Sequence, residues 1–123
     1  MKTIANKDSV LVRYAIEMKN EFILDFASAV KASLDGAQTI NLTRSNTDKT
    51  LSLVTCMVIV NNTEPKEQMD GAEIANIVVE GTVGKFLENL PVEKQEKFAR
   101  TSCLRLVTYA YLDDETVVVA NGI

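Results

Sequence analysis

The sequence predicts an α+β fold in which an antiparallel β-sheet is followed by helical structure toward the C-terminal end. Two segments, 38–62 and 74–88, alternate apolar and polar side chains, which is the pattern of strands with one buried face. The next segment, 90–114, instead repeats its apolar side chains at helical spacing. A run of strands that gives way to helices is typical of the α+β class.

The composition is that of one folded domain, 1–123. Its 123 residues are 46% hydrophobic and 24% charged, which is ordinary for a folded protein. No apolar run approaches the ~20 residues of a membrane span, and the start MKTIANKDS lacks the apolar centre of a signal peptide, so we expect a cytoplasmic protein. Cys56 and Cys103 lie in apolar runs and are expected to be buried thiols rather than a disulfide.

The charge is negative overall and unevenly placed. A net charge of −4 argues against a nonspecific nucleic-acid binder, which needs cations to neutralise phosphates. The acidic side chains are concentrated in 63–73 and in Asp113–Glu115, whereas the segment 36–62 is slightly basic.

Residues 9–35 fit two secondary structures. Their apolar side chains recur at helical spacing, which favours one long helix. Val10–Met18 also alternates as a strand does, and Asn6–Asp8 suits the turn of an N-terminal hairpin. The helix is slightly favoured by these residues alone, and both alternatives remain open.

The segment 38–62 predicts a β-hairpin around the turn residues SNTDK. Its second strand is apolar on both faces toward Cys56–Val60, which predicts a central place in the sheet. The loop 61–71 is acidic and longer than most connections, which indicates a functional or interface loop. The tail after residue 112 suits a strand or a short helix.

The segments 74–88 and 90–114 are predicted to be a long strand and a long helix. Two glycines, Gly81 and Gly84, lower the helix propensity of the first, with a bulge expected near them. Pro91 suits the first turn of the helix predicted over 90–114. From Cys103 onward this helix is apolar on nearly all sides, so it needs burial against two surfaces, and we expect a partner chain to supply one.

The residue types of common catalytic and metal sites are missing or poorly placed. The chain has no histidine, and its two cysteines cannot form a zinc site without other ligands. The carboxylates of 64–73 lack the spacing of a calcium loop. We therefore expect no enzyme, no metal and no cofactor.

The order of these elements, with the segments LTRSNTDKTLSLV and LDDETVVVANGI, resembles the coat proteins of the single-stranded RNA bacteriophages, the leviviruses. The resemblance implies that residues 1–89 are mainly antiparallel strands, with an N-terminal hairpin, a strand within 22–31 and a meander, and that 90–123 is a helical C-terminal region. It implies an interlocked homodimer, whose sheets join edge to edge and whose helices cross the partner's sheet. Such dimers build an icosahedral shell, so the protein is expected in the virion, assembled in the bacterial host cytoplasm, with no membrane partner.

The resemblance also implies functional residues. The sheet face away from the helices binds single-stranded RNA, including a hairpin that represses translation and marks the genome for packaging. The matching positions here are Asn41, Thr43, Arg44, Lys49, Ser52 and Thr82. The dimer interface is expected at Phe98, Cys103, Leu106, Val107 and Ala110.

Two alternatives remain beside these assignments. Arg44 and Lys49 are also ordinary turn residues, and an acidic chain is unexpected for a shell that packs RNA. The charge of −4 and the carboxylates of Glu64–Glu73 suit a different function, a small phage-encoded binding or inhibitor module that mimics nucleic acid. An α+β enzyme of unknown type is disfavoured by the missing motifs.

Overall fold

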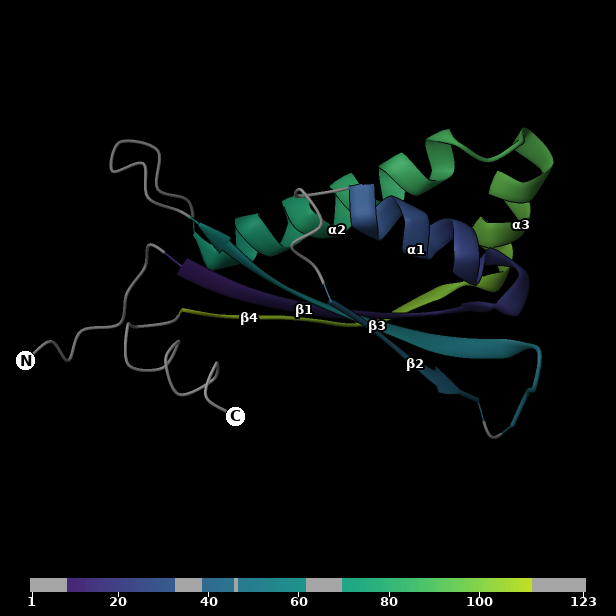
Figure 1. The fold of residues 1–123 in the computed structure, drawn as a ribbon, viewed down its shortest axis with the longest axis horizontal. Coiled ribbons are helices and arrows are strands. Elements are labelled where there is room, and N and C mark those ends of the chain that lie inside the picture. The colour runs from purple at the N-terminus through teal and green to yellow at the C-terminus, as the bar shows by residue number, and fades with distance from the viewer. Residues whose placement is uncertain (1–8, 33–38, 46, 62–69, 112–123) are drawn as a thin grey trace, which may run out of the picture.

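The structure, a computed structural model, describes residues 9–32, 39–45, 47–61 and 70–111. Its elements are, in chain order, β1 (Ser9–Lys19), the short 3-10 helix η1 (Asn20–Phe22), α1 (Ile23–Ala32), β2 (Thr39–Arg44), β3 (Leu51–Asn61), α2 (Gly71–Glu88), α3 (Val92–Thr101) and β4 (Cys103–Tyr111). The four strands form one antiparallel sheet, and the helices lie on one of its faces (Figure 1). The predicted α+β class with an antiparallel sheet is confirmed.

The strand order of the sheet is β2-β3-β1-β4, so strands distant in the chain are neighbours. With a helical connection after β1 and another after β3, this is the split β-α-β, or ferredoxin-like, arrangement. The first strand and the turn of the expected N-terminal hairpin lie in residues 1–8, outside the described residues, and the described strand β1 pairs with β3 on one side and β4 on the other. The expected meander is also wrong, because helices separate the strands along the chain.

The segment predicted as a long strand, 74–88, belongs to α2. Its buried side chains are spaced as one helix face: Ile74, Ala75, Val78, Val79, Thr82 and Phe86. Gly81 and Gly84 each cost about 1 kcal/mol relative to alanine inside a helix, and the burial of this face offsets that cost. The prediction that 1–89 is mainly strands is therefore wrong for α1 and α2.

The segment predicted as one long helix, 90–114, is helical only in its first half. The helix α3 ends at Thr101, Ser102 has an extended backbone, and β4 follows. The reason is that Cys103–Tyr111 is rich in residues that favour strands, and pairing with β1 satisfies half of its backbone groups. The prediction of a helical region over 90–123 is therefore wrong for Cys103–Tyr111. The tail beyond residue 111 lies outside the described residues.

The earlier part of the chain follows the sequence more closely. Residues 9–35 contain both predicted structures in succession, first the strand β1 and then the helix α1, so the strand expected within 22–31 is wrong. The hairpin within 38–62 is confirmed as β2 and β3, and β3 is central in the sheet as predicted. The loop residues 62–69 lie outside the described residues.

The core lies between the sheet and the helices. Alternate residues of β1 and β3 are buried there, and four phenylalanine rings pack above them. The rings of Phe86 and Phe98 are 4.8 Å apart, and each of the other two, Phe22 and Phe26, packs 5.3 Å from one of them. These rings come from η1, α1, α2 and α3, so one cluster joins every helical element to its neighbours. None of the described helices is long and apolar enough to cross a membrane.

Candidate assembly and RNA-facing surfaces

The strand β4 is an edge of the sheet, and its large apolar side chains remain partly exposed among the described residues. Leu104 is 51% exposed, Leu106 39%, Val107 36% and Tyr109 42%. Val107 and Tyr109 pair with buried residues of β1 and so share the helix-covered face, whereas Leu106 pairs with Ala15 on the opposite face. The strand is therefore apolar on both faces, as the sequence indicated, but at an exposed edge rather than in a helix.

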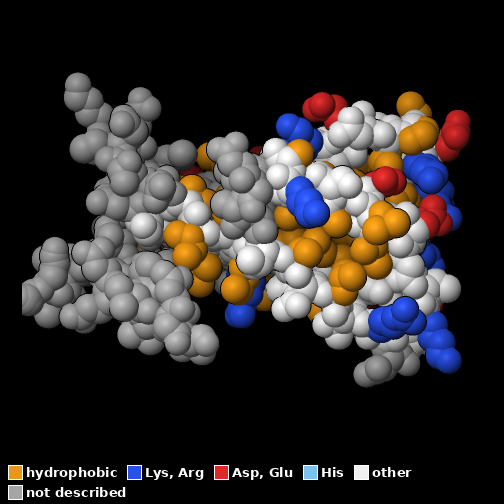
Figure 2. Space-filling view, in the orientation of Figure 1, with side chains coloured by type: hydrophobic (Ala, Val, Ile, Leu, Met, Phe, Trp, Pro, Cys, Tyr) orange, Lys and Arg blue, Asp and Glu red, His pale blue; other side chains and the backbone are white. Residues whose placement is uncertain are grey.

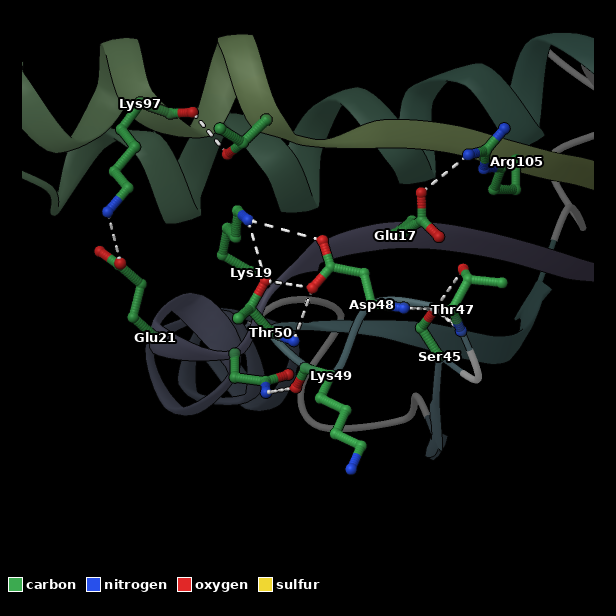
Figure 3. A network of polar contacts seen from close by, with 12 residues as sticks. Glu17, Lys19, Glu21, Ser45, Thr47, Asp48, Lys49, Thr50, Lys97 and Arg105 are labelled. Atoms are coloured by element: carbon green, nitrogen blue, oxygen red, sulfur yellow. Dashed lines mark hydrogen bonds and ion pairs between the residues drawn. The ribbon is translucent and has the colours of Figure 1, made fainter.

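A bulge divides β4 into two parts. Ala15 pairs with Leu106 and Ile16 with Leu104, so Arg105 is an extra residue on β4. The Arg105 guanidinium donates a 2.7 Å hydrogen bond from Nη2 to Glu17 Oε1 on β1 (Figure 3). This bond raises the pKa of Arg105. The regular part of the edge is thus Leu106–Tyr111.

An open, mostly apolar groove of about 430 Å³ lies beside the bulged end of β4. Its walls come from α2, α3, β1 and β4, and include Val79, Val83, Leu87, Phe98 and Leu104. Phe98, which was predicted at the dimer interface, is only 5% exposed and belongs to the core of its own chain. The other predicted interface residues, Cys103, Leu106, Val107 and Ala110, are all exposed on β4.

The two cysteines differ in environment. Cys56 on β3 is fully buried, and burial raises the pKa of its thiol to about 11. Cys103 is exposed, because it lies on the edge strand. The prediction of two buried thiols is therefore wrong for Cys103.

The opposite edge, β2, is also exposed among the described residues and partly apolar. All six of its residues are exposed. Ile40 and Leu42 pair with the buried Cys56 and Val54, so they lie on the helix side of the sheet, yet they remain 37% and 54% exposed. Figure 2 shows hydrophobic side chains gathered on this side of the molecule, below α1 and toward β3 and β2. Within the part of the chain that the structure describes, each edge of the sheet thus has partly exposed apolar side chains.

The sheet face away from the helices is open and mixed in character. Thr39, Asn41 and Thr43 of β2 lie on it, opposite Met57, Thr55 and Leu53 of β3. Each of the seven Phe and Tyr side chains of the chain instead lies on the helix side, either in the core or on β4 next to it. Among the described residues this face therefore carries hydroxyl, amide, aliphatic and charged groups, Arg13 among them, and no aromatic ring on which an RNA base could stack.

The predicted RNA-binding residues separate into two groups. Asn41 and Thr43 are exposed on the open face, Arg44 ends β2 on its other face, and Lys49 is exposed in the turn. Ser52 is 3% exposed and donates a 2.7 Å hydrogen bond to Asn20 Oδ1, while Thr82 is 1% exposed inside α2.

The burial of Ser52 and Thr82 removes both from the candidate RNA surface. Ser52 is excluded because the register of β3 turns its even-numbered residues toward the helices. Thr82 is excluded because its segment is a helix.

A polar network fixes the β2–β3 turn, and the sequence analysis did not identify it. Asp48 accepts hydrogen bonds from the Thr50 hydroxyl at 2.6 Å and the Thr50 backbone N–H at 2.9 Å, which hold the pKa of Asp48 below its ordinary value. Asn20 donates to the Lys49 carbonyl at 2.9 Å, and Lys19 donates to the Thr50 hydroxyl (Figure 3). The only available signal was the turn composition of SNTDK. In Figure 3 the Lys49 side chain points away from this network.

The charge of the described part is balanced. It holds ten of the 13 Lys and Arg and ten of the 17 Asp and Glu. The net charge of −4 therefore arises in the segments outside it. Within the described residues, no three side chains of the metal-binding types converge.

The comparisons with known proteins return no relative. No family model, no curated protein and no solved structure matches this chain.

Proposed function

We propose that this chain is a coat protein of the RNA-bacteriophage type, whose homodimers assemble into an icosahedral shell around single-stranded RNA. The observation that carries the proposal is the pair of apolar edges, β4 and β2, whose large side chains stay partly exposed among the described residues. Long apolar edge strands are sites of association, because their free backbone groups accept another strand.

Two different edges support growth beyond a dimer. A symmetric contact through one edge uses that edge in both copies and closes a dimer. The second edge then remains available on each side of the dimer for contacts with other dimers. Arg105 is the one charged residue among the nine of β4, and Arg44 the one among the six of β2. Neither edge carries the lysines, acids or prolines that commonly prevent such contacts.

The open face is the proposed RNA side. Asn41 and Thr43 offer amide and hydroxyl groups to exposed bases, and Lys49 brings a cation to one end of the hairpin, whereas Arg44 lies on the other face of the sheet. Recognition of a hairpin as a translational repressor and packaging signal rests on the family resemblance alone, and of the element order that carried this resemblance the structure keeps the hairpin β2–β3. The described residues carry balanced charge, and the excess acid lies in the other segments of the chain.

Purification of the full chain tests the proposal. Electron microscopy and light scattering should show megadalton particles that contain nuclease-protected RNA. A stable monomer or isolated dimer across salt and pH would contradict shell formation. A small oligomer that lacks RNA and binds a basic host protein would instead support the acidic inhibitor function.

Two single-residue variants sharpen this test, one on the β2 edge and one on α1 as its control. Leu42→Lys places a charge on the β2 edge and should leave dimers that do not form shells. Leu24→Lys, at a side chain that is 81% exposed on α1, is the matched control and should assemble normally. Equal assembly of both variants would show that the β2 edge is not an assembly contact.

A further inference from the structure

We infer that Arg13, on the inner strand β1, is the group that holds an RNA phosphate on the open face, so that the bound strand crosses the sheet instead of following the β2–β3 hairpin. The inference rests on the proposed RNA-binding function and changes where its main charged contact lies. The family resemblance placed the contacts on the hairpin strands and on a strand expected over 74–88, which in this fold belongs to the helix α2.

The register of the sheet places Arg13 in the middle of the open face. Its neighbours Val12 and Tyr14 are fully buried on the helix side, so the Arg13 side chain lies on the opposite side. Arg13 pairs with Met57 of β3 on one side and with Thr108 of β4 on the other. The Arg13 side chain is exposed, so a ligand on this face can reach it.

Arg13 is also the charged side chain of this face that the other described residues leave unpaired. Glu17 of the same face accepts a 2.7 Å hydrogen bond from Arg105. Lys19, farther along β1, has its Nζ 3.9 Å from Asp48 Oδ2. Neither an ion pair nor a hydrogen bond joins the Arg13 guanidinium to another described residue. The described strands therefore present one uncompensated positive charge on the open face, which suits an anion.

The chemistry of the guanidinium favours a phosphate as this anion. Its planar fork can donate two parallel hydrogen bonds to phosphate oxygens, and such charge-assisted bonds are stronger than neutral ones. Leu11 and Ala15, two residues away on β1, and Met57 on β3 place apolar groups beside it on the same face. Apolar surroundings lower the local dielectric constant and so strengthen the attraction between the two charges.

Hydroxyl and amide groups form a row with Arg13 across the four strands. Thr108 of β4 lies directly opposite Arg13. Thr55 of β3 is its diagonal neighbour, and Asn41 of β2 pairs with Thr55. Three strand spacings of about 4.8 Å make this row ~14 Å long. Because phosphate contacts position a nucleic acid while hydroxyl and amide groups contact its sugars and bases, the row favours a strand bound across the sheet.

A nucleic-acid strand is the occupant that the whole row fits. A carboxylate could also bind the guanidinium, and the acidic residues outside the described ranges, such as Asp113–Glu115, are one source of carboxylates. A carboxylate would use the guanidinium alone, however, whereas a nucleotide chain also uses the neutral polar groups on both sides of it. An acidic peptide is therefore the competing ligand that the experiment must separate from RNA.

Replacement of Arg13 tests the inference against a matched control. The unmodified chain, Arg13→Gln and Arg44→Gln are compared in filter binding with a short labelled single-stranded RNA of mixed sequence at several salt concentrations. Arg44 is an exposed arginine on the other face, so it matches Arg13 in charge but not in place. Arg13→Gln should bind the RNA about tenfold more weakly at low salt. Its slope of log affinity against log salt should fall by about 0.7, the value for one phosphate of a single strand.

Two further variants of the same measurement identify the kind of contact. Arg44→Gln should leave both the affinity and the slope unchanged. Arg13→Lys should keep the slope and lose part of the affinity, because an ammonium keeps the charge without the planar fork. Circular dichroism establishes that every variant is folded. Weaker RNA binding by folded Arg13→Gln, with Arg44→Gln unchanged, supports the inference.

Three results would overturn it. The first is equal RNA affinity of Arg13→Gln and the unmodified chain. The second is equal weakening by both arginine variants, which would show a general effect of net charge. The third is binding of polyglutamate that competes with the RNA and depends on Arg13 to the same extent, which would identify an acidic peptide as the ligand.

The particles separate this inference from the proposed function. If Arg13→Gln forms particles that contain as much nuclease-protected RNA as those of the unmodified chain, the coat function stands and the inference fails. If particles never form but RNA binding depends on Arg13, the shell proposal fails and the inference stands. If the unmodified chain binds no RNA, the RNA part of the proposed function and the inference fail together.

Discussion

The ring of Tyr109 lies against Gly71, the first residue of α2, so closely that a Cβ at Gly71 would overlap ring atoms Cδ2 and Cε2. The neighbouring Tyr111 hydroxyl bonds to the Gly71 N–H at 2.9 Å and donates to Asp70 Oδ1 at 3.1 Å. Two tyrosines of the edge strand thus fix the start of the longest helix. A rearrangement of β4 would therefore be transmitted to α2 through these contacts.

Gly71→Ala should destabilise the protein by about 1–3 kcal/mol, since the added methyl group overpacks this contact. Gly81→Ala is the matched control. Nothing lies within 4 Å of a Cβ there, so removing a glycine from the helix interior should stabilise by up to ~1 kcal/mol. Urea unfolding of both variants measures the difference. Equal stabilisation by the two substitutions would show that Tyr109 does not restrict Gly71.

Ser52 should act in stability rather than in RNA binding. Ser52→Ala leaves Asn20 Oδ1 without its 2.7 Å hydrogen bond, which should cost about 1–3 kcal/mol in thermal or urea unfolding. The RNA content of assembled particles should stay unchanged. A loss of packed RNA at unchanged stability would restore Ser52 to the RNA surface.

Lys49→Ala should weaken RNA binding and reduce the salt dependence of that binding. An exposed lysine that contacts a phosphate contributes about one unit to the slope of log affinity against log salt. Filter binding of RNA recovered from particles, at several salt concentrations, gives that slope. Lys31→Ala on α1, away from the open face, is the control. An unchanged slope for Lys49→Ala would identify it as an ordinary turn residue.

The Asp48 carboxyl should make stability depend on acidic pH. Its pKa is lowered below 3.8 by hydrogen bonds from the side chain and then the backbone of Thr50. The carboxylate therefore stabilises the fold above the unfolded pKa, and this contribution is lost as pH falls through the folded pKa. Thermal unfolding between about pH 2 and 6 should show a weaker acid dependence for Asp48→Asn. The same pH dependence of stability in the unmodified protein and in Asp48→Asn would show that the Asp48 carboxyl does not contribute to the acid dependence.

The Cys56 thiol should make stability fall in alkali. Its pKa is raised from 9.0 to about 11 by burial, so between these values the unfolded chain releases a proton that the folded chain retains. Stability should fall by up to ~1.4 kcal/mol per pH unit in this range, and Cys56→Ala should remove this part of the slope. In the folded protein a thiol reagent should modify the exposed Cys103 quickly and Cys56 slowly. Fast modification of both would show that the core opens readily.

The sequence predicts the hairpin well because three signals agree there. The alternation, the turn residues and the β-branched content of 38–62 all favour β2 and β3, and the two-sided apolar pattern of β3 indicates its central place. The segment 74–88 is wrongly predicted to be a strand because several apolar residues at its odd positions also fit one face of a helix. The adjacent buried pairs Ile74–Ala75 and Val78–Val79, four residues apart, were the better signal.

The strand β4 shows a different limit of prediction. A segment that is apolar all round suits a buried helix or a strand with two apolar faces equally, and local sequence does not decide between them. Pairing with β1, about 90 residues earlier in the chain, decides it. The candidate RNA surface has the same limit. Both Asn41 and Ser52 are polar residues of the hairpin strands and so suit RNA contact by sequence. Only the register of the strands places Asn41 on the open face and Ser52 on the helix side.

The tyrosines of β4 make association of this strand optically visible. The chain has no tryptophan and three tyrosines, of which Tyr109 and Tyr111 lie on β4 with ring centres 5.9 Å apart. Two of the three tyrosines therefore lie on this edge strand, which is a proposed assembly contact. Emission intensity and anisotropy, followed during dilution, then report the gain or loss of that contact without an attached dye.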